Sequence, residues 1–109
     1  MALMAQFKTA YLQREVRIDA KPSADLKVGQ VCTYTPGTQA LAAASSLVAG
    51  SVIIAQSDMT MAKYTDGKMN VKIADHDYSY SDKVAASTTA KPVMVFVVTD
   101  VNDVITQTV

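Results

Sequence analysis

Only one stretch of the chain gathers the side chains that bind metals or move protons: residues 75–82, DHDYSYSD. It contains three aspartates and the only histidine of the sequence. A calcium loop of the EF-hand kind beginning at Asp75 would need Gly at its sixth position and Glu at its twelfth. Tyr80 and Ala86 stand at those positions. The spacing therefore excludes an EF-hand loop.

A transition-metal site is poorly supported by the same stretch. In an extended chain Asp75 and Asp77 share one side while His76 points to the other, so the three side chains do not converge without a tight turn. Zinc sites draw mainly on several His and Cys ligands. We therefore expect a polar loop or edge strand, with no metal, no cofactor and no catalytic residue. The alternatives are an adventitious cation contact, or acid–base chemistry by the two aspartates, which requires a concave site.

The single cysteine, Cys32, excludes an internal disulfide. It lies in GQVCTY, and free cysteine is usually a small buried residue, so we expect a core or strand position. As a nucleophile it would need His76 as its base, together with an aspartate. We expect that the protein is not an enzyme.

Composition limits the class of protein further. A chain of 109 residues makes one domain, and its apolar content is mostly aliphatic because aromatic residues are only 6%. Ten basic residues balance ten acidic ones without a basic cluster, which argues against nucleic-acid binding. No apolar run is long enough to cross a bilayer. The first residues lack the basic and apolar segments of a signal peptide, so we expect synthesis in the cytoplasm.

The dominant periodicity is that of β-strands. Alternation predicts a half-exposed strand over 11–19, broken at Pro22, and a closing strand over 104–109. Continuous apolar runs predict buried strands in SVIIAQSD, 51–58, and in VMVFVVTD, 93–100, the latter buried on both faces. A turn or a bulge is expected at Gly29. Turns are expected at Asn102-Asp103 and at Pro36-Gly37, where Gly37 would accept a positive φ.

Three further segments complete the predicted secondary structure. Asp66-Gly67 predicts a hairpin over 60–73, with Tyr64 opposite Met69. The Ala-rich segment 40–46 predicts either a short helix ending near Gly50 or a packed loop. Residues 83–89 are small and polar, typical of a loop or a short turn of helix.

These elements predict a mainly β fold, a small single-domain β-barrel or β-tulip-like sandwich with a short Ala-rich helix or loop. The β-rich domain would span 11–109. Residues 1–10 would form an extended amino-terminal arm, either frayed or ordered against a neighbouring subunit. In the second case the contact residues would be Leu3, Met4, Phe7 and Tyr11.

Tyr78 and Tyr80 share one face if their segment is a strand. Either they pack on the core of the domain itself, or they form a surface for a protein partner, because tyrosine is enriched at the centres of interfaces.

Three segments, SADLKVGQVCTY, LVAGSVIIAQSDMT and KPVMVFVV, resemble the small head-decoration proteins of tailed bacteriophages, the lambda-type group. The likeness covers about residues 23–105 and consists of patterns of Gly, Ala and Val. The sequence departs from the family at Gln56-Ser57-Asp58, where an acidic pair often stands, and in its Tyr- and Ser-rich segment 78–81.

The resemblance implies a β-rich protein on the outer capsid surface of the virion, made in the host bacterial cytoplasm. It would form a homotrimer there, with its amino-terminal arm on the major capsid protein. Binding to the expanded shell but not to its precursor would stabilise the shell. The rivals are a host- or glycan-binding module of a head fibre or tail tip, using Tyr64, Tyr78 and Tyr80, and a tail structural subunit.

Overall fold

The computed structural model describes residues 2–9, 13–57 and 83–109, and the regular secondary structure within them is almost entirely β-strand. The one helical element in these ranges is a 3-10 helix, Val101–Asp103. The strands are β1 Leu3–Phe7, β2 Val16–Pro22, β3 Leu26–Lys27, β4 Val31–Thr35, β5 Ala40–Ala43, β6 Val52–Ser57, β7 Lys83–Val84, β8 Lys91–Val97 and β9 Val104–Thr108.

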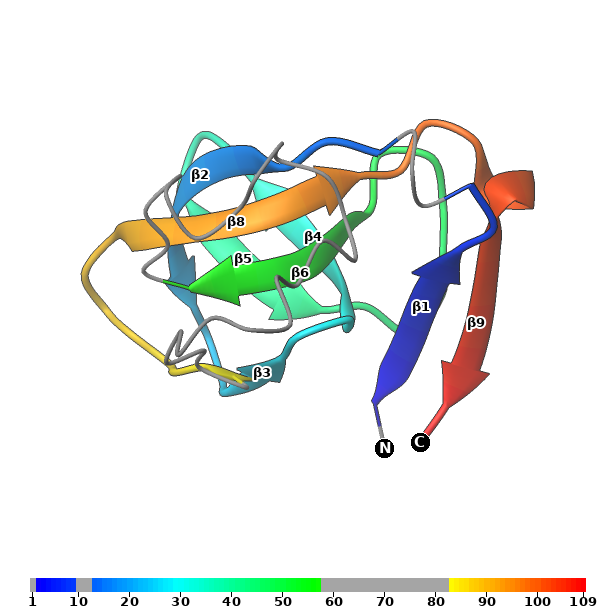
Figure 1. Cartoon of the computed structure of the whole chain (residues 1–109). Coiled ribbons are helices and arrows are strands. Elements are labelled where there is room, and N and C mark those ends of the chain that lie inside the picture. Colours follow the sequence, from blue (N-terminus) through cyan, green and yellow to red (C-terminus); the bar gives the residue numbers. More distant parts are fainter. Residues whose placement is uncertain (1, 10–12, 58–82) are drawn as a thin grey trace, which may run out of the picture.

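Five strands close into a barrel in the order β2-β5-β4-β6-β8, and β8 pairs back onto β2 (Figure 1). All the contacts between barrel strands are antiparallel except the short parallel pairing of β2 with β5. Strands β1 and β9 form a separate antiparallel pair beside the barrel, here called the terminal ribbon, and β3 pairs with β7. The predicted mainly β, single-domain barrel is thus confirmed.

Strand β8 is continuously apolar from Val93 to Phe96 because both faces of this stretch are buried. Val93 and Val95 point into the barrel, whereas Met94 and Phe96 point out of it, and all four are buried. The period of two in a strand therefore supplies two separate cores. The prediction that this strand is buried on both faces is confirmed.

The two cores divide the buried side chains between the inside and the outside of the barrel. The barrel core comprises Ala20, Leu26, Cys32, Leu41, Val52, Ile54, Val84, Val93 and Val95. The outer core lies between the barrel and the terminal ribbon, and comprises Phe7, Val31, Ile53, Ala55, Met94, Phe96, Val98 and Val104. Apart from the two phenylalanines of the outer core, both cores consist of aliphatic side chains with one cysteine and one methionine, in line with the aromatic-poor composition.

Those two phenylalanines join the ribbon to the barrel. The rings of Phe7 on β1 and Phe96 on β8 meet edge to face, with centroids 5.9 Å apart and an interplanar angle of 75°. Such pairs are favourable beyond the area they bury, because the positive edge of one ring meets the negative face of the other. Val104, the first residue of β9, is buried beside them.

The Ala-rich segment corrects one prediction, since Ala40–Ala43 is strand β5 and neither a helix nor a loop. It pairs with β4 on one side and β2 on the other, and Leu41 between the alanines is fully buried in the barrel core. Closing the barrel satisfies the backbone and buries Leu41, which outweighs the small intrinsic helix preference of alanine.

Other boundaries also differ from the predicted ones. Strand β2 begins at Val16, and Pro22 is its buried last residue rather than a break. The turn after Thr35 is present, but its positive φ of 61° belongs to Gln39, not to Gly37. Lys83–Val84 is a short strand whose Val84 is fully buried, where a loop or helical turn was expected. The predicted hairpin over 60–73 lies outside the described residues.

Phe7→Ala tests whether the terminal ribbon depends on the phenylalanine contact. We expect the free energy of unfolding to fall by about 3–5 kcal/mol, because a buried ring is lost and a cavity remains. Val48→Ala, at a valine that is 58% exposed, should change it by less than about 0.5 kcal/mol. Urea denaturation measures both variants, and equal effects would contradict the assigned role of Phe7.

Candidate functional site: the terminal ribbon

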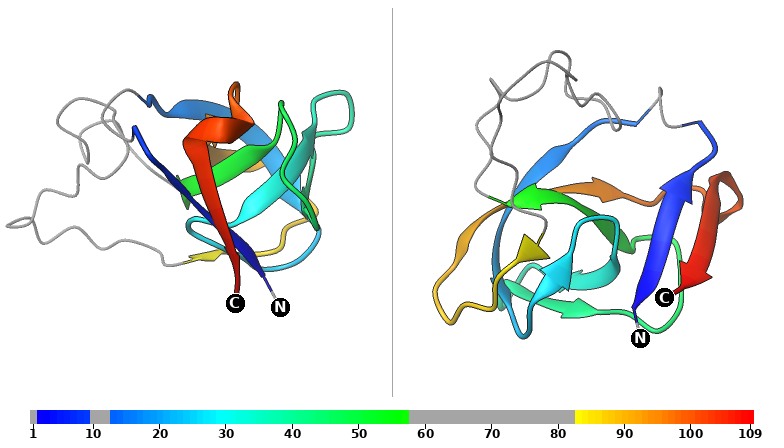
Figure 2. Two further views of the ribbon diagram at one scale, coloured as in Figure 1. Left: turned by 90° about the vertical axis from the view of Figure 1, so that its right-hand side faces the viewer. Right: turned by 60° about the horizontal axis from the view of Figure 1, so that its bottom comes forward.

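The terminal ribbon packs on the outside of the barrel, and both described ends of the chain lie on it side by side (Figure 2). Its register pairs Leu3 with Thr108 and Phe7 with Val104. Leu3 and Ala5 are half-buried against the outer core, while Gln6 is exposed on the opposite face. The ribbon therefore has one face toward the barrel and one toward solvent.

A turn at Gly29 fixes β1 against the barrel. The carbonyl oxygen of Gly29 accepts a hydrogen bond from the amide of Ala5 at 2.9 Å, and the amide of Gly29 donates to the carbonyl of Ile54 at 2.7 Å. Gly29 has φ +91°, a conformation that favours glycine, and a Cβ there would lie 3.3 Å from Cε of Met4. Of the two predicted alternatives at Gly29, a turn or a bulge, the structure has the turn, and it lies against the side chain of Met4.

Asp103 holds together the chain leaving β1 and the chain entering β9. Its carboxylate accepts hydrogen bonds from the amide of Thr9 at 3.1 Å, from the Thr9 hydroxyl, and from Nε2 of Gln13 at 3.1 Å. Its carbonyl accepts from the amide of Lys8 at 2.7 Å. One carboxylate thus orders the chain that leaves β1, a role that the predicted turn at Asn102-Asp103 does not imply.

The predicted contact residues fall into two groups. Leu3, Met4 and Phe7 lie on β1, but Phe7 is only 4% exposed and is used by the outer core of its own chain. The pairing of β1 with β9 places the extended amino-terminal segment on its own domain. Tyr11 and the tyrosines Tyr64, Tyr78 and Tyr80 lie outside the described residues, as does the whole stretch 75–82 with His76.

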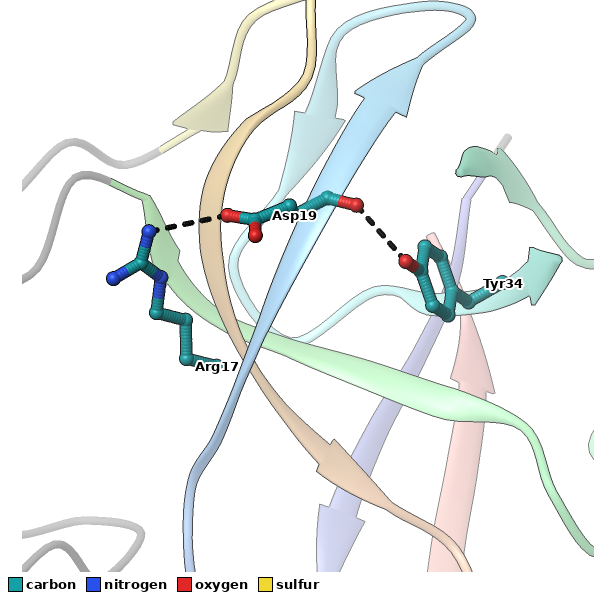
Figure 3. A network of polar contacts seen from close by, with 3 residues as sticks. All are labelled: Arg17, Asp19 and Tyr34. Atoms are coloured by element: carbon teal, nitrogen blue, oxygen red, sulfur yellow. Dashed lines mark hydrogen bonds and ion pairs between the residues drawn. The ribbon is translucent and has the colours of Figure 1, made fainter. Parts of the chain in front are cut away.

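Tyr34 links two strands of the barrel by a hydrogen bond. Its hydroxyl donates to the backbone carbonyl of Asp19 at 2.9 Å, which links β4 to β2 across the intervening strand β5 (Figure 3). The carboxylate of Asp19 accepts from Arg17 at 3.2 Å in an exposed pair. Exposed pairs of this kind contribute little, so the network is structural rather than a site.

Cys32 is fully buried in the barrel core, as predicted. Burial disfavours the charged thiolate and raises the pKa of the Cys32 thiol from its ordinary value of 9.0 to about 12. A thiol in this environment is protonated at neutral pH, so Cys32 has the chemistry of a core residue and not of a nucleophile.

Within the described ranges, no three His, Cys, Asp or Glu side chains come close enough to hold a metal ion. None of the helical structure in these ranges has the length and apolarity needed to span a membrane.

The fold places this chain among small, mainly β single domains with a closed barrel, and the described residues indicate no narrower class. Comparisons with protein-family models, with curated proteins and with solved structures found no match for this chain.

Asp103→Ala should destabilise the protein by about 1–3 kcal/mol, because the part-buried donors of Thr9 and Gln13 lose their acceptor. Asp100→Ala is the matched control, since it removes the same charge nearby but frees only the exposed amide of Asn102. We expect the control to cost no more than about 1 kcal/mol in urea denaturation. Equal losses of unfolding free energy in the two variants would contradict the role of Asp103 in holding the chain after β1.

Alkylation of Cys32 by iodoacetamide should be roughly a thousandfold slower at pH 8 in the folded protein than in urea, because the thiolate fraction falls tenfold per pKa unit. Thr33→Cys in a Cys32→Ala background is the control, since residue 33 is the exposed neighbour on β4 and should react at the ordinary rate. Burial of the neutral Cys32 thiol makes a contribution to the free energy of unfolding that is fully present below pH 9.0. This contribution falls as the pH rises toward about 12, because the thiol ionises in the unfolded chain before it ionises in the folded protein. Fast labelling of folded Cys32 would contradict its burial.

Proposed function

We propose that this chain is a lambda-type head-decoration protein, which binds the outside of an expanded bacteriophage capsid and stabilises the shell. Its partner would be the major capsid protein, and it would cluster there as a homotrimer. The strongest support for the proposal is where the three segments that resemble this family lie in the fold.

Those three segments are separate in the sequence, but the barrel strands that they contain, β4, β6 and β8, are adjacent. Residues 23–34 supply β3, the Gly29 turn and most of β4; residues 47–60 include the Gly50 turn and β6; and residues 91–98 include β8. In the barrel, β6 lies between β4 and β8. The resemblance therefore concerns one continuous wall with its two positive-φ glycine turns, which favours a shared fold over a chance likeness of Gly and Val patterns.

The terminal ribbon gives this proposal a contact surface. Leu3 and Met4 are half-buried on β1, so each combines contact with its own chain and surface open to a partner. Because the ribbon stands beside the barrel, a partner that binds it leaves the barrel core undisturbed. Phe7 stabilises this surface from within, and Leu3 and Met4 remain the candidates for direct contact.

The mechanism needs no catalytic group. A protein that binds the expanded shell and not its compact precursor stabilises the expanded form by about 2.7 kcal/mol per site at a concentration one hundred times Kd. Many copies on one shell add these contributions, so modest affinity at each site is sufficient. The balanced charge of the chain fits a partner recognised by shape and apolar contact.

The proposal is tested by sedimenting the purified protein with stripped heads of the phage that encodes it, compact and expanded. We expect saturable binding to expanded heads alone, and a higher temperature of head disruption when the sites are filled. Binding to neither form would overturn the proposal, and binding of a glycan array instead would move the assignment to a host-binding module.

Met4→Gln tests the contact surface in the same assay. We expect about a tenfold loss of affinity for expanded heads, equal to 1.4 kcal/mol, because an apolar anchor is replaced by a polar side chain. Thr38→Gln, in the exposed turn between β4 and β5, is the control and should bind normally. Urea denaturation of both variants separates lost contact from lost folding, and unchanged binding by a folded Met4→Gln would exclude this surface.

A further inference from the structure

In the part of the chain that the structure describes, strand β9 presents an open edge. In the ribbon, Ala2 and Val109 exchange both of their backbone hydrogen bonds at 2.8 Å, so alternate residues of β9, Gln107 and Ile105, bond toward β1. The backbone groups of Thr106 and Thr108 consequently point away from β1. Among the described residues β9 pairs with β1 alone, and Figures 1 and 2 place β9 on the side of β1 away from the barrel.

The other strand of the ribbon has no such edge. By the same alternation the backbone of Ala5 points away from β9, and its amide is bonded to Gly29 of the barrel at 2.9 Å. The two edges of the ribbon therefore differ: the edge of β1 is docked and the edge of β9 is open.

Strand β9 also lacks the features that protect edges from pairing. Charged residues, proline and bulges normally discourage strand addition. Residues 104–109, VITQTV, contain no charged side chain and no proline, and all but Gln107 are β-branched. Beyond Val104 every side chain is exposed, including Ile105 at 55% and Val109 at 61%. The strand is thus suited to pairing with another strand.

We propose that two copies of this chain associate through β9, antiparallel, with Thr106 of one copy opposite Thr108 of the other. Each of these pairs uses only outward backbone groups. In this register Ile105 faces Val109 of the second copy, and Gln107 faces its own counterpart at the two-fold axis. The two ribbons then form one continuous sheet in the order β1-β9-β9-β1.

Three observations favour a second copy in this register. Side chains opposite each other at the positions without hydrogen bonds are in closest contact, and here the exposed Ile105 and Val109 cover one another. A two-fold axis brings a residue that lies on it close to the same residue of the second copy. Gln107 lies there, and because its side chain is neutral the two copies do not repel each other. The register shifted by one pair would need the amide of Val104, which already donates to Val101.

The proposal stands independently of the capsid proposal, because it concerns the purified protein in solution. An interface of one edge strand falls in the small, weak class, below about 1,200 Å². We therefore expect a concentration-dependent monomer–dimer equilibrium and not a permanent dimer.

Sedimentation velocity over a series of protein concentrations measures that equilibrium. Ile105→Lys should weaken dimerisation at least tenfold, because it places a charge in the apolar pair. Gln6→Lys is the matched control: it adds the same charge on the same face, at the residue paired with Ile105 in β1, but away from the open edge. A chain that stays monomeric or forms only trimers, or equal effects of the two variants, would overturn the proposal.

Cysteine cross-linking tests the register in a Cys32→Ala background. Residues opposite each other at a position without hydrogen bonds have Cα atoms about 4.5 Å apart, within reach of a disulfide. Gln107→Cys should therefore give a covalent dimer under mild oxidation. Thr106→Cys should not, since residue 106 of the second copy is a diagonal neighbour in this register, about 7–8 Å away. Cross-linking of Thr106→Cys at the same rate as Gln107→Cys, or of neither, would contradict the register.

Discussion

The packing of apolar side chains on both faces of β8 is the constraint on which the rest of the structure depends. Val93 and Val95 help to fill the barrel, while Met94 and Phe96 form the surface that receives the terminal ribbon. A polar residue at any of these positions would leave one core incomplete. Because β6 alternates in the same way, the two strands together form a wall with the barrel on one side and the ribbon on the other.

The parts of the fold that sequence reasoning predicted are those whose signal is local. The runs that became β6 and β8 are continuously apolar, and the turn at Gly29 needs a residue that tolerates a positive φ. Strand β5 could not be predicted, because alanine favours helix locally and only the closure of the barrel around Leu41 makes it a strand. The pairing of β1 with β9 has no local signal, because it joins opposite ends of the described chain.

The candidate site was predicted less well, for a related reason. Leu3, Met4 and Phe7 were identified as contact residues because they are apolar and precede the first predicted strand. The sequence does not show that Phe7 has a partner in Phe96 of the same chain, and so it could not separate the buried anchor from the half-buried Leu3 and Met4. Ile105 was part of a predicted strand, but its exposure depends on which face of the ribbon turns away from the barrel: Ile105 lies on that face with its partner Gln6, whereas Val104 is buried opposite Phe7. The tyrosine hypotheses lie outside the described residues.

The pairing of Leu3 with Thr108 also has a consequence for the order of folding. Contacts between residues far apart in sequence require the closure of a long loop, and they form late. On the ribosome β1 emerges before β8 and β9, which carry Phe96 and Val104 of the outer core around Phe7. The aromatic ring of Phe7 therefore lacks its partners on β8 and β9 until these strands have been synthesised, and until then the nascent chain exposes an apolar segment that can associate with other chains.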